Sequence, residues 1–144
     1  MTLENRLIEE MKQAMKKGDK LRLDVIRLLR AAIKNVEIDK GKINDEGIQT
    51  IVQQQVKQWT DALEDYKKGE RQDLIEETQQ KIRILQEYLP QQLDDAELKK
   101  IIIQVKEEAG MDQLGPLIGK VKQEVGNKAE GNRIATLARD LLNN

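Results

Sequence analysis

Apolar residues recur along nearly the whole chain at the three- and four-residue intervals of an α-helix. In the first such run the apolar side chains fall at positions 3, 7, 8, 11, 14 and 15. Residues with this spacing share one side of a helix, which has to be buried against another element. Aromatic residues, which strands favour, make up only 2% of the chain, and Gln, Glu, Lys, Leu and Ala are abundant. The sequence therefore predicts an all-α protein.

Capping residues, glycines and a proline divide this pattern into seven predicted helices. Thr2, Asp19 and Asn44 are suited to cap the first three, because their side-chain oxygens can accept hydrogen bonds from free N–H groups in the first turn. Asp94 followed by Glu97 is a capping-box pattern for the fifth. The predicted helices cover about residues 3–17, 20–39, 45–68, 73–89, 95–109, 113–125 and 130 onward.

The clearest boundary in the chain is at Pro90. Proline disfavours a helical conformation in the residue before it, so the fourth helix is expected to end at Leu89. We therefore expect a longer N-terminal four-helix bundle over residues 1–89 and a compact C-terminal three-helix unit over residues 90–144.

The same periodicity predicts which side chains form the core. In the second helix we expect Leu28 inside with its apolar neighbours, and in the first helix we expect Met15 inside. Trp59 and Tyr66 lie seven residues apart on an apolar face. A base-stacking platform would need them exposed, so core packing is the interpretation we favour.

The chain lacks the side chains on which most catalytic and metal sites depend. It has no Cys, no His and no Ser. This composition excludes disulfides, thiolate and imidazole metal sites, and Ser-His, Ser-Lys and Cys-His nucleophiles. We expect no catalytic residue, no metal and no cofactor. No aliphatic run approaches the ~20 residues of a membrane helix, and the acidic N-terminus is unlike a signal peptide. We therefore expect a cytoplasmic protein with no membrane partner.

Basic residues are concentrated in the first quarter of the chain. Residues 1–36 carry nine basic and five acidic side chains, a net charge of +4, within a chain whose net charge is −1. Arg27, Arg30 and Lys34 have i, i+3, i+7 spacing and share one helix face. Such a stripe suits a phosphate backbone, but on charge alone a solvated outer face is the interpretation we favour. The sequence pI of about 5.7 argues against indiscriminate nucleic-acid binding, and no DNA partner is expected.

A second candidate region spans residues 115–131. Gly126 and Asn127 tolerate positive φ and suit a tight turn that exposes backbone N–H groups where the next helix starts. With nearby cations, such groups could meet a phosphate. From these residues alone, an ordinary helix–helix turn is the interpretation we favour. The candidate nucleic-acid-binding residues of this region are Lys120, Lys122, Asn127, Lys128, Gly131 and Arg133.

Four stretches of the sequence form a recognisable pattern: RLDVIRLLRAAIKNVEI from residue 22, RQDL from 71, ILQEYLPQQL from 84, and the glycine-bearing segment 115–131. Taken in order, they resemble the GatB/YqeY family over essentially the whole chain. The chain departs from the usual family pattern at Gly126-Asn127, where Lys-Gly is common, at Glu130, where Asp is common, and at Pro116, where a lysine is common. It therefore lacks two of the family's basic residues in this region.

This resemblance implies a longer N-terminal bundle followed by a three-helix unit. In larger relatives the same module is the tail of the GatB subunit of the glutamine-dependent aminoacyl-tRNA amidotransferase, where it contacts tRNA away from the catalytic centres. For this chain the resemblance implies a non-catalytic tRNA-binding module, with tRNA and a tRNA-modifying or aminoacylating enzyme as expected partners. Two alternatives stay open: a carbon–nitrogen ligase with glutamine as amido-N donor, and a protein–protein adaptor.

Overall fold

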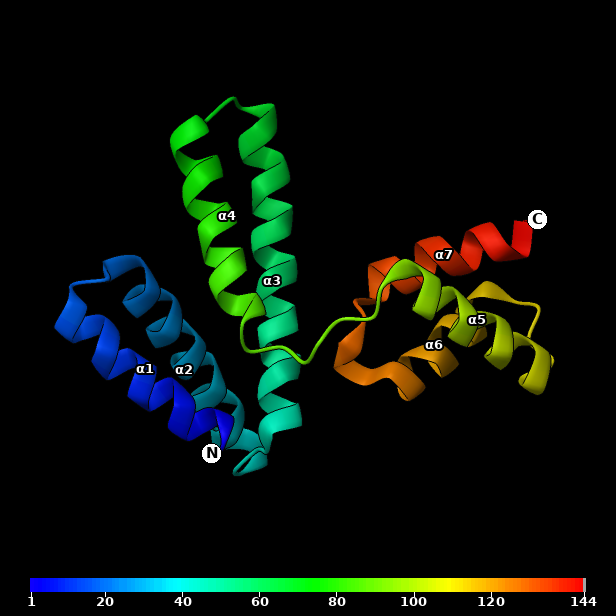
Figure 1. Ribbon diagram of the computed structural model, residues 1–144, viewed down its shortest axis with the longest axis horizontal. Helices are drawn as coiled ribbons and strands as arrows, with labels where there is room; N and C mark the ends of the chain where they lie inside the picture. Colours follow the sequence, from blue (N-terminus) through cyan, green and yellow to red (C-terminus); the bar gives the residue numbers. More distant parts are fainter. Residues whose placement is uncertain (144) are drawn as a thin grey trace. The chain divides into compact units, whose positions relative to one another are not determined.

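The computed structural model describes residues 1–143, and within them every regular element is helical. The prediction of an all-α fold is confirmed (Figure 1). The elements are α1 (Leu3–Lys17), α2 (Lys20–Lys40), α3 (Asp45–Lys68), α4 (Gln72–Gln86), α5 (Asp95–Ala109), α6 (Leu114–Val125), the single 3₁₀ turn η1 (Gly126–Lys128) and α7 (Gly131–Asn143).

The predicted N-caps are all present. Thr2, Asp19 and Asn44 each accept a hydrogen bond from the backbone N–H three residues later. Asp94 and Glu97 form the complete capping box, with each side chain accepting from the other residue's backbone N–H. These local hydrogen bonds fix where four of the helices begin.

The chain forms two compact units, residues 1–89 and residues 90–144. In the first unit α1 and α2 pack side by side, and α3 and α4 form a long hairpin (Figure 1). Its core is aliphatic and centres on Ile26, Leu29, Val52 and Leu85, each 0% exposed. These residues come from α2, α3 and α4, so the apolar stripes of three helices meet in one core.

Two of the predicted core positions in this unit are wrong. Leu28 is 51% exposed and Met15 is 54% exposed, whereas Ile26, which the periodicity did not single out, is fully buried. α2 buries Val25, Ile26, Leu29 and Ile33. Because α2 contacts α1, α3 and α4, the partners select this face, and Leu28 lies outside it although its spacing fits a helical stripe.

α4 ends three residues earlier than predicted. Its last helical residue is Gln86. The backbone N–H groups of Glu87, Tyr88 and Leu89 then donate to the carbonyls of residues 84, 85 and 86, respectively. These i→i+3 bonds tighten the chain into 3₁₀-like turns before Pro90, which cannot follow a regular helical residue easily. The turns bury Tyr88, which is 1% exposed.

The second unit is a three-helix arrangement with its own core. α6 and α7 pack together, and α5 contacts both. The centre of the core holds two fully buried residues from each helix: Leu98 and Ile102 from α5, Leu117 and Val121 from α6, and Ile134 and Ala138 from α7.

Candidate nucleic-acid interface

The turn between α6 and α7 is a compact structure whose carbonyl groups point into the protein. Gly126 has φ +56°, a conformation that favours glycine. Asn127 does not share it, because Glu70 is the only non-glycine residue with positive φ among those described. The Nζ atom of Lys122 donates to the carbonyls of Gly126 (2.9 Å) and Ala129 (2.8 Å). The two intervening carbonyls also accept hydrogen bonds, so four consecutive acceptors are satisfied internally.

Those two bonds come from the segment that precedes α5. Gln92 donates its side-chain amide to the carbonyl of Asn127 (2.9 Å), and the N–H of Leu93 donates to the carbonyl of Lys128 (2.9 Å). Gln92 and Leu93 were not among the residues predicted for this region. Both fall in a stretch that carries the family resemblance, but nothing local in the sequence pairs them with residues 35 positions away.

Lys122 is therefore a structural part of the turn. Its ammonium group bridges two carbonyls at the C-terminal end of α6, where a cation also complements the helix dipole. Burial lowers the pKa of Lys122 below its usual value, and the Glu130 carboxylate partly opposes this lowering. The amino group is occupied in holding the turn together, so it does not project as a free phosphate ligand.

Arg133 has a similar anchoring role at the start of α7. Its guanidinium Nη2 donates to the carbonyl of Leu93 and to the carboxylate of Asp95, both at 2.8 Å. The side chain is about one-third exposed. Arg133 thus ties the first turn of α7 to the segment around the α5 N-terminus.

The remaining predicted residues of this region differ in exposure. Lys120 and Lys128 are exposed, and among the described residues neither side chain has a hydrogen-bond or ion-pair partner. Asn127 is buried at 8% exposure. Gly131, the first residue of α7, is partly exposed, and a Cβ built on it would meet no atom within 4 Å. Of the predicted cations in this region, the exposed ones without a partner are therefore Lys120, in α6, and Lys128, in the turn.

The predicted basic stripe in the first unit lies along α2. Arg27 and Lys34 are exposed. Arg30 is half-buried, with its Nη1 3.3 Å from the sulfur of Met11 in α1. Exposed Leu28 lies beside these residues in α2. That this stripe contacts nucleic acid stays a prediction.

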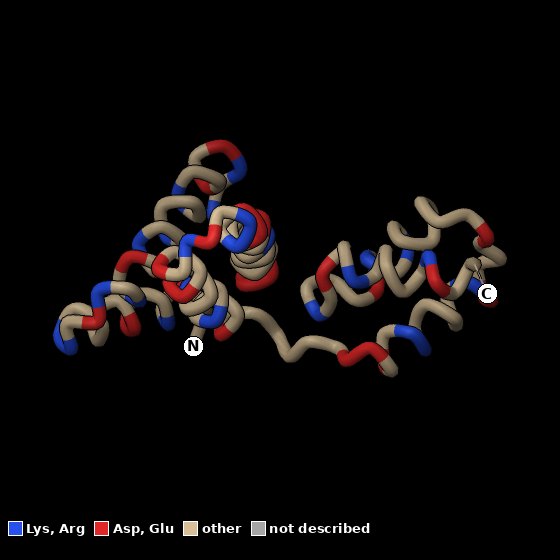
Figure 2. Tube along the Cα trace, turned by 90° about the horizontal axis from the view of Figure 1, so that it is seen from above, with Lys and Arg blue, Asp and Glu red and all other residues tan. Residues whose placement is uncertain are grey.

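Charges of both signs are interleaved along the helices of each unit (Figure 2). This pattern is typical of solvated outer faces and gives no broad basic surface. Any contact of basic side chains with nucleic acid would therefore have to involve a small group of neighbouring residues.

The first unit contains a polar cluster that was not predicted from the sequence. The hydroxyl of Tyr88 donates to Glu10 at 2.6 Å, and the guanidinium carbon of Arg6 lies 4.7 Å from the centre of the Tyr88 ring. Arg22 in α2 forms an ion pair with Glu87 at 2.8 Å. The cluster joins α1 and α2 to the turns that follow α4. Tyr88 and Glu10 are 78 positions apart, so no local pattern pairs them.

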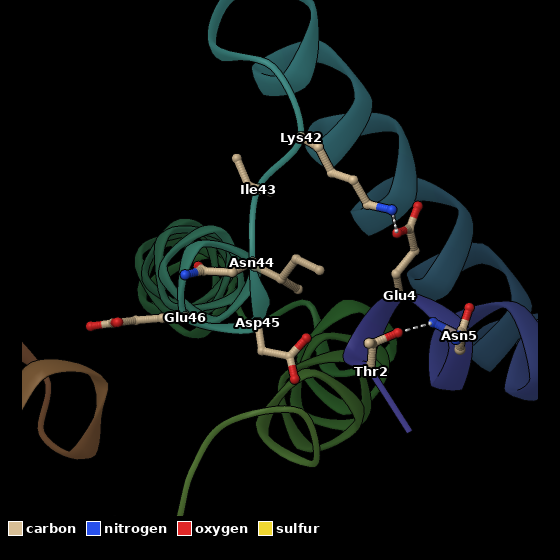
Figure 3. Close-up of a pocket in the computed structure, with 9 residues that line it drawn as sticks. Thr2, Glu4, Asn5, Lys42, Ile43, Asn44, Asp45 and Glu46 are labelled. Carbon is tan, nitrogen blue, oxygen red and sulfur yellow. Dashed lines mark hydrogen bonds and ion pairs between the residues drawn. The ribbon is translucent and has the colours of Figure 1, made fainter.

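A hollow near the N-termini of α1 and α3 is lined by several carboxylates, but their interactions are structural (Figure 3). Glu4 forms an ion pair with Lys42 at 3.6 Å, and Asp45 accepts a hydrogen bond from the N–H of Leu3. Glu46 points away from both (Figure 3). Among residues 1–143, no group of three or more His, Cys, Asp or Glu side chains is placed to hold a metal ion.

Trp59 and Tyr66 are half-buried. The ammonium of Lys81 lies 4.3 Å from the centre of the Trp59 ring. One face of this indole is thus already covered by a cation, as in other cation–π pairs.

A family model described as "Yqey-like protein" matches residues 4–142. The chain belongs to the YqeY-like family. Three relatives of this YqeY-like chain carry the name "Altered inheritance of mitochondria protein 41, mitochondrial". They are 31% identical in Vanderwaltozyma polyspora, 26% in Pyrenophora tritici-repentis and 33% in Kluyveromyces lactis. The alignments cover 80%, 86% and 80% of this chain, and 66%, 71% and 66% of the respective relatives. No helix among the described residues is long and apolar enough to cross a membrane.

Proposed function

We propose that this YqeY-like chain is a non-catalytic tRNA-binding module that acts in the cytoplasm and contacts RNA through its C-terminal unit. The observation that carries the proposal is the construction of the α6–α7 turn. Its four consecutive carbonyls, from Gly126 to Ala129, accept hydrogen bonds inside the protein. Carbonyl oxygens that face a phosphate would repel it, and here each of the four carbonyls accepts a hydrogen bond from a group of the same unit.

The two exposed lysines supply the attraction. Lys120 lies in α6 before the turn and Lys128 lies within the turn, and their side chains carry no internal partner among the described residues. An ammonium without an internal ion pair can exchange counterions for RNA phosphates, which is the main source of sequence-independent affinity. The family resemblance supports tRNA as the nucleic acid, because the related GatB tail is understood as a tRNA-contacting appendage.

We propose two roles for the six predicted residues. Lys120 and Lys128 are proposed to contact phosphate, with Gly131 leaving open space at the start of α7. Lys122, Asn127 and Arg133 are proposed to hold the turn, because their polar groups are engaged or buried within the unit.

Charge reversal tests this division. The double variant Lys120→Glu with Lys128→Glu is expected to weaken binding of fluorescently labelled tRNA at least tenfold at low salt, because two attractions become repulsions. Lys99→Glu with Lys100→Glu makes the same change in net charge on exposed positions of α5 and is the matched control. Equal weakening by both pairs would show a non-specific charge effect and contradict the proposed site. Release of glutamate from glutamine by the purified chain would contradict the non-catalytic role.

A further inference from the structure

Leu93, in the segment before α5, is held against the α6–α7 region through both of its backbone groups. Its N–H donates to the carbonyl of Lys128 at 2.9 Å, and its carbonyl accepts a hydrogen bond from Nη2 of Arg133 at 2.8 Å. Its side chain packs against the core of the second unit. The backbone of Leu93 is therefore fixed, and its hydrogen bond in turn fixes the backbone of Lys128.

Gln92 supports this contact from the preceding position. Its side-chain amide nitrogen donates to the carbonyl of Asn127 at 2.9 Å and to the carbonyl of Pro90 at 2.8 Å. The first hydrogen bond reaches the turn, and the second holds the side chain against its own segment. Gln92 and Leu93 thus bind the carbonyls of two consecutive residues of the turn, and we call residues 92 and 93 the strap.

Lys128 lies where regular secondary structure gives little support. It is the last residue of η1, and Ala129 after it is extended, with φ −148° and ψ 138°. Hydrogen bonds within a one-turn 3₁₀ helix have poorer geometry than those of an α-helix, so bonds from outside contribute more to its conformation. Lys122 binds the carbonyls of Gly126 and Ala129, and the strap binds the two carbonyls between them. The strap therefore helps to set the direction in which the Lys128 side chain leaves the backbone.

Lys120 is supported differently. It lies within α6, whose own backbone hydrogen bonds fix its direction. The strap binds carbonyls that come after the last residue of α6. A change in the strap should therefore alter the orientation of Lys128 and leave that of Lys120 unchanged.

We propose that Gln92 is a positioning residue for nucleic-acid binding, which acts through the strap by holding Lys128 where its ammonium group meets a phosphate. This role rests on the proposed function, in which Lys128 contacts phosphate. Fixing the backbone of Lys128 before binding reduces the cost of ordering it in the complex. A direct contact of Gln92 with RNA is the weaker explanation, because the two N–H groups of its amide are already engaged by two carbonyls.

Two adjacent glutamines provide a matched pair of variants. Gln91 and Gln92 are both exposed, and of the two only Gln92 has a side-chain hydrogen bond among the described residues. In the full chain, Gln92→Ala is expected to speed amide exchange of Leu93, measured by NMR, by about two- to tenfold, the range that the net free energy of one hydrogen bond gives. Gln91→Ala should leave this exchange rate unchanged. The measurement needs no tRNA.

The salt dependence of tRNA binding tests the effect on Lys128. Gln92→Ala removes no charge, yet it is expected to weaken binding of labelled tRNA by about two- to fivefold. Its log–log salt slope should lie between those of the unchanged chain and of Lys128→Ala, because loss of a neutral contact alone would not change the slope. In double-mutant cycles, Lys128→Ala should reduce affinity by a smaller factor when combined with Gln92→Ala, whereas Lys120→Ala should reduce it by the same factor in both chains. Thermal unfolding by circular dichroism checks that each variant is folded.

Three results would overturn the proposal. Unchanged exchange of Leu93 in Gln92→Ala would show that this side chain does not hold the strap. Binding of tRNA by the unchanged chain, with additive effects of Gln92→Ala and Lys128→Ala and an unchanged salt slope, would remove the positioning role and leave the proposed function standing. Absence of tRNA binding by the unchanged chain would remove the proposed function itself and the positioning role with it.

Discussion

Replacing Tyr88 by phenylalanine removes one hydroxyl from the cluster that joins α1 to the end of α4. The ring is 1% exposed and stays in place in the variant. The contact between the Arg6 guanidinium and the ring, at 4.7 Å, is also retained. The change therefore removes the 2.6 Å hydrogen bond from the hydroxyl to Glu10, together with the interaction between the hydroxyl and the Arg22 guanidinium.

The expected loss of stability follows from the type of bond. A hydrogen bond to a charged group contributes about 1.5–3 kcal/mol. The Glu10 side chain is 30% exposed, so water can replace part of the interaction in the variant. We therefore expect Tyr88→Phe to lower the free energy of unfolding of the first unit by about 1.5–2 kcal/mol, the lower part of that range.

Trp59 makes this measurement simple, because it is the only tryptophan and lies in α3 of the first unit. Urea unfolding followed by its fluorescence reports that unit. Tyr66→Phe is the matched control. Tyr66 is half-buried and its hydroxyl has no hydrogen-bond partner among the described residues, so the free energy of unfolding should change by no more than about 0.5 kcal/mol. Equal effects of the two variants would refute the reasoning.

The pH dependence gives a second check on the same bond. Desolvation raises the pKa of Glu10, but the Tyr88 hydroxyl and the Arg6 guanidinium lower it by more, so the net pKa is below its usual value. Because its pKa is lower in the folded state, the ionised carboxylate stabilises the fold at pH values above its unfolded-state pKa of about 4.3. This stabilisation is lost as the pH falls through the lower folded-state pKa. The penalty of Tyr88→Phe should be full at pH 7 and shrink below about pH 4.

Two other substitutions test separate parts of the structure. Lys122→Met should destabilise the second unit by about 2–3 kcal/mol, because it leaves two carbonyls, one of them on fully buried Ala129, without their donor. Faster amide exchange in α6 and α7, with an unchanged unfolding transition of Trp59, would show this loss of stability. An effect no larger than that of Lys120→Met would contradict the role of Lys122. Glu70→Gly should stabilise the first unit by about 0.5–1 kcal/mol in urea unfolding, because Glu70 has φ +53° in the α3–α4 turn; a destabilised variant would show that the side chain contributes more than the strain costs.

Local chemistry made the helix starts predictable. Thr2, Asp19, Asn44 and Asp94 each act on a backbone group three residues away, so the information lies within one turn of sequence. The side of each helix that faces inward is a tertiary property. Leu28 fits a helical stripe, yet the partners of α2 select the face that contains Ile26.

The roles of the basic residues could not be predicted for a related reason. A lysine that bridges two carbonyls and a lysine that extends into water have the same sequence signature. Only the structure distinguishes Lys122, with acceptors four and seven residues ahead, from exposed Lys120 and Lys128. The hydrogen bond from Gln92 to the turn joins residues that are 35 positions apart. It depends on the path of the chain before α5, which helical periodicity does not predict.

The salt dependence of tRNA binding tests the central claim most directly. Labelled tRNA is titrated with the full chain at several salt concentrations, and duplex DNA of similar length serves as the control. The proposed contacts predict saturable binding that favours tRNA, with a log–log slope of about −0.7 to −0.9 for each phosphate contacted, and a shallower slope for Lys128→Glu. No binding at low salt, where the electrostatic attraction is strongest, or equal affinity for DNA, would contradict a tRNA-binding role.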